Sequence, residues 1–155
     1  MERRVEALVV GGGLAGLSAA YFLARRGLRP WVLEREAPLS CTSDKSTEAY
    51  RLFWPGDEDL AALVRESLDL LSPFAGVARP NRRGYLYVGR LEALEAMALE
   101  APHAGPLRVH REAATYPKEA ASGLDLLLPG ALGEACPYLG HLRGLAGLHA
   151  RPPRW

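Results

Sequence analysis

The sequence has few cysteines, no long apolar run and almost no net charge. Its 2 cysteines, Cys41 and Cys136, are far apart, and the 4 histidines are dispersed, so no metal site is expected. With 19 basic and 18 acidic residues, the composition favours neither a nucleic-acid-binding protein nor a membrane-surface protein. Neither a signal peptide nor an apolar segment long enough to span a bilayer is visible, which predicts a reduced, cytoplasmic protein.

The strongest positive signal lies in residues 5–34. An apolar segment at residues 5–10 predicts a buried strand, and the segment Gly-Gly-Gly-Leu-Ala-Gly at residues 11–16 predicts a turn that opens a helix. The helix is expected to continue to about Arg26 and to end at Gly27, before a second strand at residues 31–34. Strand, glycine turn, helix and strand in this order predict a dinucleotide-binding unit.

Each special position in this unit has a physical reason. Gly11 allows the sharp turn, Gly13 lets a pyrophosphate approach the backbone, and Gly16 lets the helix pack closely on the strand. The carboxylate of Glu34 is expected to accept hydrogen bonds from ribose hydroxyls and to repel the 2′-phosphate of NADP. FAD and NAD both remain open at this point. The predicted contacts of the turn are Gly11, Gly12, Gly13, Leu14, Ala15 and Gly16.

The rest of the chain predicts a mixture of helices and strands without internal repeats. A Ser/Thr-rich polar segment follows at residues 37–49, and Tyr85 and Tyr87 are expected on one face of a strand. The expected elements are helices at 59–74 and 91–101, strands at 85–88, 107–110 and 145–149, a turn at 81–84 and a helical turn at 131–136. The first of these helices is expected to carry an apolar stripe of Leu60, Leu63, Leu68, Leu70 and Leu71.

The N-terminal unit, the pair Glu34-Arg35 and the Ser/Thr-rich segment at residues 41–51 resemble the D-amino-acid-oxidase-like superfamily of FAD-dependent oxidoreductases. Glycine oxidase, sarcosine oxidase and D-arginine dehydrogenase are members of it. The resemblance implies an α/β fold: a Rossmann-like FAD/NAD(P)-binding domain with a parallel sheet, plus an incomplete α+β substrate domain. We expect the binding unit and flavin-contacting loop at residues 1–55 and part of the substrate domain at residues 56–155.

The resemblance also implies a cofactor and a set of site residues. FAD would be bound by the glycine turn, by Glu34 and Arg35, and by the polar segment that follows. Arg51 takes the place of a family arginine that faces the substrate, where a guanidinium group matches a carboxylate. The expected flavin contacts of the polar segment are Thr42, Ser43, Lys45, Ser46 and Thr47.

Two functional hypotheses follow. In the first, the chain is an FAD-dependent oxidoreductase, or its truncated N-terminal part, that oxidises the C–N bond of a small-molecule substrate, an amino acid or a secondary amine. In the second, it is a catalytically silent nucleotide-binding module. A second polypeptide or another copy of the chain would then cover the C-terminal edge, which ends on an apolar strand and Trp155. An NAD-dependent dehydrogenase is a third option, but it would leave the Ser/Thr-rich segment without a role.

Overall fold

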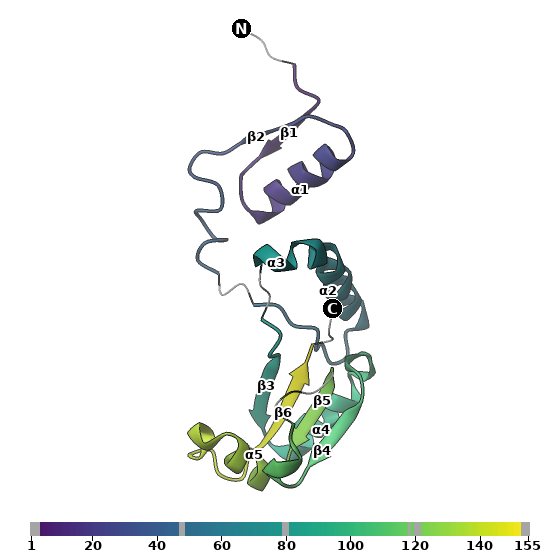
Figure 1. Ribbon diagram of the computed structural model, residues 1–155, viewed down its shortest axis with the longest axis vertical. Coiled ribbons are helices and arrows are strands. Elements are labelled where there is room, and N and C mark those ends of the chain that lie inside the picture. The colour runs from purple at the N-terminus through teal and green to yellow at the C-terminus, as the bar shows by residue number, and fades with distance from the viewer. Residues whose placement is uncertain (1–3, 47–48, 79–80, 118, 120–121, 153–155) are drawn as a thin grey trace. The chain divides into compact units, whose positions relative to one another are not determined.

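The computed structural model describes residues 4–46, 49–78, 81–117, 119 and 122–152. The chain divides into two compact units, Met1–Ala49 and Tyr50–Trp155 (Figure 1). Residues 50–55, which the sequence pattern groups with the binding unit, are therefore part of the second unit. Within the described ranges, no helix combines the length and the apolar character needed to cross a bilayer.

The first unit is a strand, a helix and a second strand. β1 (Ala7–Val10) leads into the glycine turn, α1 (Leu14–Arg25) follows, and β2 (Pro30–Leu33) lies parallel to β1. Gly27 follows α1 with a φ of +86°, and its amide donates a 2.9 Å hydrogen bond to the Ala24 carbonyl. β1 is shorter than predicted and β2 is shifted by one residue, but the order of elements and the parallel pairing confirm the α/β fold class.

Among the described elements of the first unit, none covers one face of this two-stranded sheet. Leu8 pairs with Trp31 and Val10 with Leu33, so these four side chains share a face, and they are between 43% and 80% exposed. The other face carries Val9, which lies next to α1. Parallel sheets are usually covered on both faces. The uncovered face is therefore a surface on which a further layer of protein would fit.

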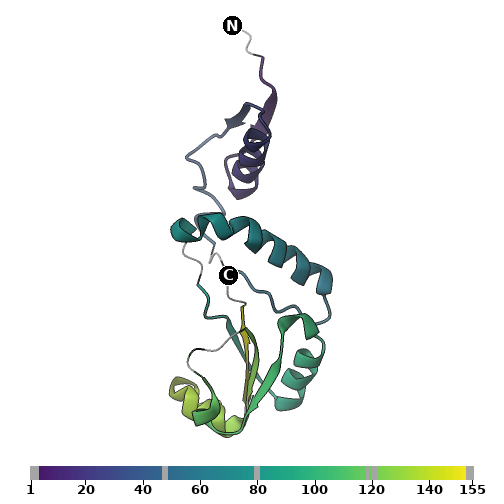
Figure 2. The ribbon, with the colours of Figure 1, turned by 45° about the vertical axis from the view of Figure 1, so that its right-hand side comes forward.

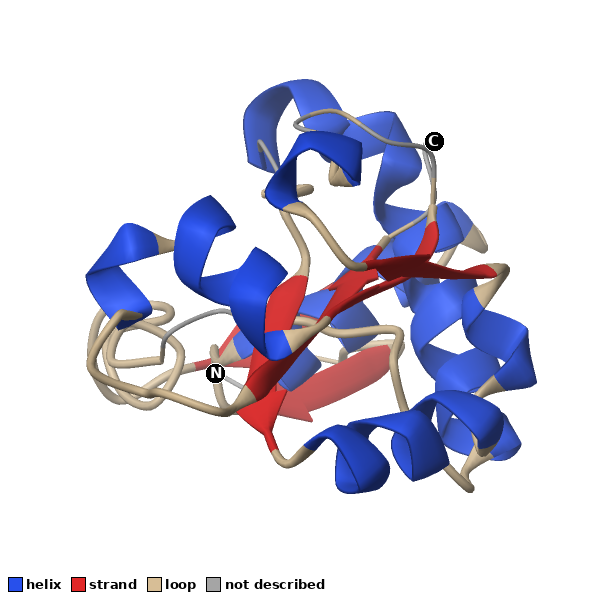
Figure 3. Ribbon diagram, turned by 90° about the horizontal axis from the view of Figure 1, so that it is seen from below, coloured by secondary structure: helices blue, strands red, loops and turns tan. Residues whose placement is uncertain are grey.

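The second unit contains a four-stranded sheet and several helices (Figure 3). Its elements are α2 (Glu58–Leu71), α3 (Ala75–Ala78), β3 (Tyr85–Gly89), α4 (Leu91–Leu99), β4 (Leu107–His110), β5 (Gly123–Leu127), α5 (Pro129–Ala135) and β6 (Ala146–Arg151). Single 3₁₀ turns lie at Ser72–Phe74, Pro102–Ala104, Ala113–Thr115 and Pro137–Leu139.

The strands of the second unit lie in the order β3-β6-β5-β4. β6 is antiparallel to both of its neighbours, and β4 is parallel to β5. Figure 2 shows the sheet close to edge-on, with α4 and α5 on opposite sides of it. The predicted elements at 85–88, 91–101, 107–110, 131–136 and 145–149 are confirmed as β3, α4, β4, α5 and β6, with small shifts at their ends. β5 was not predicted, although it is buried along its whole length.

The predicted leucine stripe on α2 is wrong. The buried residues of α2 are Ala61 and Leu68, whereas Leu63, Leu70 and Leu71 are each more than 50% exposed. Residues 61 and 68 are two turns apart on one side of a helix, and residues 63 and 70 lie on the opposite side. The leucines of α2 therefore belong to two different faces, and only one of them contributes to the core.

The apolar core of the second unit lies between the sheet and α4. Alternating residues of β5 and β6, such as Leu126 and Leu148, face Leu94 of α4. Tyr87 of β3 packs against this core, and its ring centroid is 5.2 Å from that of Phe53. Tyr85 and Tyr87 stack at 6.3 Å, which confirms that they share a face of the strand. The Tyr87 hydroxyl is buried and has no hydrogen-bond partner within the described ranges.

Tyr87→Phe is therefore expected to raise the free energy of unfolding. A buried hydroxyl without a partner costs about 1–3 kcal/mol of desolvation, and its removal leaves the ring contacts in place. We expect a gain of about 1 kcal/mol in urea unfolding, and a change within about 0.5 kcal/mol for Tyr85→Phe. A loss of stability in Tyr87→Phe would show that the hydroxyl has a partner in solution.

The opposite face of the sheet is partly polar. Asp125 of β5 is fully buried and accepts hydrogen bonds from Arg108 Nε (2.7 Å), Arg151 Nε (2.5 Å) and His110 Nε2 (2.9 Å). Burial alone would raise the pKa of Asp125, but the hydrogen bonds from Arg108, His110 and Arg151 outweigh it and hold that pKa well below its usual range. The two guanidinium groups also bind carbonyls of the connection before β5, namely those of Ser122 and Pro117. We call the side chains of Asp125, Arg108, His110 and Arg151 the Asp125 cluster.

His149 continues the polar side of this face. Its Nδ1 lies 2.7 Å from the Tyr116 hydroxyl, and its Nε2 lies 2.5 Å from the Arg83 carbonyl. Because a carbonyl can only accept, Nε2 carries the proton and Nδ1 accepts from Tyr116. Burial lowers the pKa of His149, so the imidazole stays neutral at pH 7.

Candidate dinucleotide-binding site

The glycine turn between β1 and α1 requires glycine at two of its positions, at Gly11 because of its backbone conformation and at Gly16 because of a lack of space. Gly11 has a φ of +102°, and its amide donates a 2.8 Å hydrogen bond to the Leu33 carbonyl at the end of β2. A Cβ built on Gly16 would overlap the Gly11 carbonyl oxygen and lie 3.3 Å from Val9 Cγ1. Because Gly16 has no Cβ, α1 can approach β1 closely. The first amides of the helix then point out of the turn.

The start of α1 is open to an anion. Gly13 is the N-cap residue and makes no side-chain capping hydrogen bond, and the first turn of α1 contains no acidic residue. A Cβ on Gly13 would meet only Ser43 Oγ, at 3.9 Å, so the space above it is free. The Leu14 amide donates a weak 3.3 Å hydrogen bond to the same Ser43 oxygen. The accessible backbone of Gly13, the first amides of α1 and the helix dipole can together bind a phosphate group.

Glu34 lies beside this turn immediately after β2. Its Oε2 accepts a 2.5 Å hydrogen bond from the Gly12 amide, and its Oε1 accepts from the amides of Arg35 (2.7 Å) and Glu36 (3.0 Å). Backbone hydrogen bonds from Glu36, Gly12 and Arg35 lower the pKa of Glu34 and keep it ionised at neutral pH. Each carboxylate oxygen accepts about two hydrogen bonds, so Oε2 retains capacity for a hydroxyl donor.

The segment after Glu34 folds back over the glycine turn. The Leu39 amide donates a 3.0 Å hydrogen bond to the Gly12 carbonyl, and Leu39 adopts a φ of +64°, which is uncommon for a branched residue. The segment and the turn enclose a cavity of about 120 Å³. It is lined by Gly13, Glu34, Ala37, Leu39, Ser40, Cys41, Thr42 and Ser43. Most pockets for whole ligands measure about 300–1,000 Å³, so this cavity suits one part of a nucleotide, such as its ribose or a phosphate.

The structure brings some predicted site residues together and not others. Thr42 and Ser43 line the cavity with Gly13 and Glu34, whereas Lys45 and Ser46 do not. The Arg35 side chain is exposed and forms an ion pair with Glu36 at 3.4 Å, so only its amide contributes to the site. Thr47 lies outside the described residues, and Arg51 belongs to the second unit.

Two features of the site were missed in the sequence. Ala37, Leu39 and Ser40 line the cavity, but apolar and small residues in a loop give no sequence signal for this role. The amide contacts of Glu34 were also missed, because they depend on how the loop closes after β2. In the described part of the chain, no three histidine, cysteine, aspartate or glutamate side chains are grouped as metal ligands would be.

Comparison with known proteins agrees with this geometry. Residues 6–149 match the model of a family described as FAD dependent oxidoreductase. The chain is 46% identical over 63 residues to aklavinone 12-hydroxylase DnrF of Streptomyces peucetius, and the aligned segment covers 37% of this chain and 13% of that protein. It is 39% identical over 87 residues to D-amino-acid oxidase of Streptomyces coelicolor, and the aligned segment covers 54% of this chain and 26% of that protein.

The chain thus spans about a quarter or less of the length of these curated relatives. The family match, in contrast, extends over nearly the whole chain and includes both units. The open helix start, the glycine turn and the ionised Glu34 are the features that such a flavin dinucleotide requires. The chain therefore belongs to the family of FAD-dependent oxidoreductases, and its cofactor is FAD.

Proposed function

We propose that this chain forms the nucleotide-binding part of an enzyme that oxidises the C–N bond of an amino acid or a secondary amine. FAD, when bound, supplies the acceptor for the hydride removed from the substrate. The observation that carries the nucleotide role is the position of Glu34, whose ionised carboxylate is fixed by three backbone amides beside the glycine turn. In this role Gly13 and the start of α1 hold the pyrophosphate, and Glu34 holds the ribose.

The amino-acid substrate is supported by the second unit. The likeness to D-amino-acid oxidase covers 87 residues, more than the first unit contains, so it extends into the unit that carries Arg51. Arg51 has no acidic partner among the described side chains. A guanidinium group without a counter-ion is suited to bind the carboxylate of an amino acid.

Glu34→Ala is expected to weaken ADP and FAD binding by about 10- to 150-fold, the range for a hydrogen bond to a charged group. Isothermal titration of the full chain with ADP, FAD and NAD measures the effect. Glu34→Gln keeps the size of the side chain and one acceptor oxygen, and is expected to lose less affinity. Glu36→Ala, the exposed neighbouring acid, is the matched control and should bind ADP like the wild type. Unchanged ADP affinity in Glu34→Ala would contradict the proposed position of the ribose.

The uncovered face of the first unit supports a second candidate function, a nucleotide-binding module without catalysis of its own. Leu8, Val10, Trp31 and Leu33 form an apolar surface that another polypeptide would cover. Size-exclusion chromatography with light scattering, with FAD present, distinguishes the two candidates. A monomer that oxidises an amino acid and bleaches its flavin supports the oxidoreductase. A chain that binds FAD but stays inactive until a partner is added supports the module.

A further inference from the structure

Arg51 is held by a single aromatic ring. Its guanidinium carbon lies 3.7 Å from the centroid of the Trp54 ring, close enough for a strong cation–π contact. The Nε1–H of the same indole donates a 2.9 Å hydrogen bond to the backbone carbonyl of Arg51. Trp54 thus restrains both the backbone and the side chain of Arg51.

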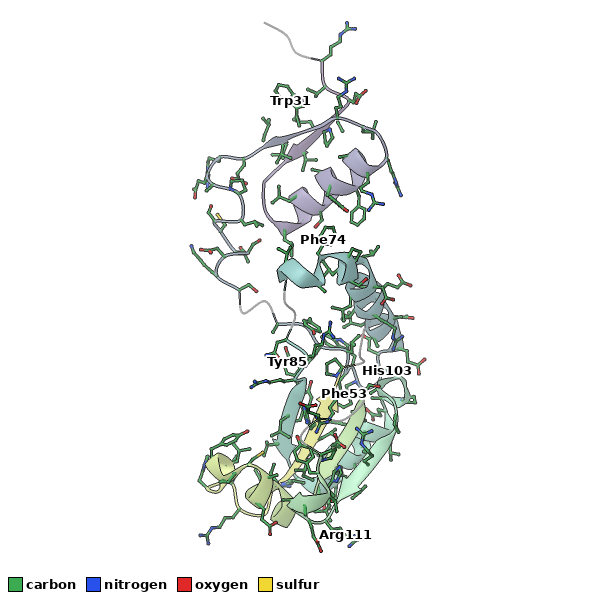
Figure 4. All side chains as sticks on the ribbon, viewed as in Figure 1. Trp31, Phe53, Phe74, Tyr85, His103 and Arg111 are labelled. Carbon is green, nitrogen blue, oxygen red and sulfur yellow. The ribbon has the colours of Figure 1, made fainter. Side chains whose placement is uncertain are left out.

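The ring itself is attached to the core. Phe53, between Arg51 and Trp54, is only 3% exposed and packs against Tyr87 of β3. Figure 4 shows Phe53 beside the sheet of the second unit. Because the neighbouring residue is anchored in the core, the Trp54 ring is a firm support for a cation.

The contact with Trp54 leaves the hydrogen-bonding edges of Arg51 available. The side chain is half-buried, and it forms no hydrogen bond or ion pair with the residues that the structure describes. By contrast, Arg108 and Arg151 both bind the carboxylate of Asp125. A guanidinium group that stacks through its face still presents its planar N–H groups, which fit a carboxylate with two parallel hydrogen bonds.

We propose that Trp54 is a positioning residue, which fixes the guanidinium group of Arg51 so that its free edge binds the carboxylate of the substrate. The inference rests on the proposed function, in which Arg51 receives that carboxylate. A free arginine side chain would lose rotamer entropy on binding, and Trp54 removes much of this loss in advance. Trp54 contributes through Arg51 and needs no contact with the substrate.

The test uses the full chain with propionate as a simple carboxylate and propionamide as its neutral counterpart. The Arg51 Nε–H signal in NMR spectra is expected to show an upfield ring-current shift in the wild type. The shift should vanish in Trp54→Leu and persist in Trp54→Phe, which keeps a ring but loses the indole donor. The propionate dissociation constant should rise about five- to tenfold in Trp54→Leu and less than threefold in Trp54→Phe. Propionamide should bind none of the variants.

Two controls separate the inference from the function on which it rests. Arg51→Leu should abolish saturable propionate binding, and if binding persists there, the proposed role of Arg51 is wrong. Trp31→Leu, a tryptophan change in the first unit, should leave the propionate affinity and the Arg51 signal unchanged. If Trp54→Leu and Trp54→Phe both bind propionate like the wild type, or if the wild type lacks the upfield shift, Trp54 does not position Arg51. Thermal unfolding of each variant confirms that the compared proteins are folded.

Discussion

Asp125→Ala is expected to lower the free energy of unfolding of the second unit by about 3–5 kcal/mol, the usual effect of removing one partner from a buried ion pair. The Asp125 carboxylate is fully buried and is the shared acceptor for Arg108, Arg151 and His110. Without it, two neighbouring guanidinium groups lose the carboxylate that they share, and one of them, that of Arg151, is only 10% exposed. Native domains have little stability in reserve, so a loss of this size leaves much of the second unit unfolded.

Urea unfolding followed by circular dichroism measures this effect. Asp69→Ala, an exposed change in α2, is the matched control and should alter the unfolding free energy by less than about 0.5 kcal/mol. Equal stability of Asp125→Ala and the wild type would mean that water reaches the Asp125 cluster and screens its charges.

The same cluster predicts how stability depends on pH. Since the folded pKa of Asp125 lies below the value of about 3.9 in an unfolded chain, its ionised form stabilises the fold at every pH above that value. The contribution is lost as the pH falls below about 4 towards the folded pKa. The unfolding free energy of the wild type should therefore fall more steeply below pH 4 than that of Asp125→Asn.

Gly16→Ala is expected to destabilise the first unit by about 2 kcal/mol or more, although alanine favours helices over glycine by about 1 kcal/mol. The added Cβ would overlap the Gly11 carbonyl oxygen, and backbone atoms at the end of β1 cannot move aside as a flexible side chain can. The overpacking therefore outweighs the gain in helix propensity. We expect ADP binding to disappear together with the folded state of this unit.

Gly13→Ala is the matched control for this change. Its Cβ would meet only Ser43 Oγ at 3.9 Å, so the fold should be retained while ADP binding weakens, because the methyl group lies where a phosphate approaches the backbone. Hydrogen exchange of the α1 amides separates the two variants. If Gly16→Ala shows wild-type protection in α1, then α1 tolerates a wider separation from β1 than the structure indicates.

The first unit could be predicted from sequence because its chemistry restricts its residues. A dinucleotide-binding turn requires glycine at positions 11 and 16 because of the backbone conformation and close packing there, and an acid at position 34 to bind the ribose. These residue types can therefore be recognised in the sequence without knowledge of their tertiary contacts. The loop over the turn was less predictable. Leu39 and Ser40 line the cavity because the loop contacts the turn, and these residue types do not predict such contacts.

β5 escaped prediction for a related reason. Asp125 interrupts its apolar run, and an aspartate in a short apolar segment is typical of a turn. The strand exists because Arg108 and Arg151, from the strands on either side, neutralise that aspartate. Their positions in space depend on the pairing of strands that are distant in sequence, which local patterns do not contain. The leucines of α2 were misassigned likewise, because the sequence does not show which side of a helix meets the sheet.

The strand order β3-β6-β5-β4 has a consequence for synthesis of the chain on the ribosome. Among the described strands β3 pairs only with β6, so the first strand of this sheet to be made must wait for the last. At ~5–20 residues per second, the roughly 56 residues between these strands take several seconds to synthesise. Throughout that interval the aromatic strand Tyr85–Gly89 has no partner edge. Nascent chains are then most exposed to aggregation, and slow codons between the two strands would lengthen that period.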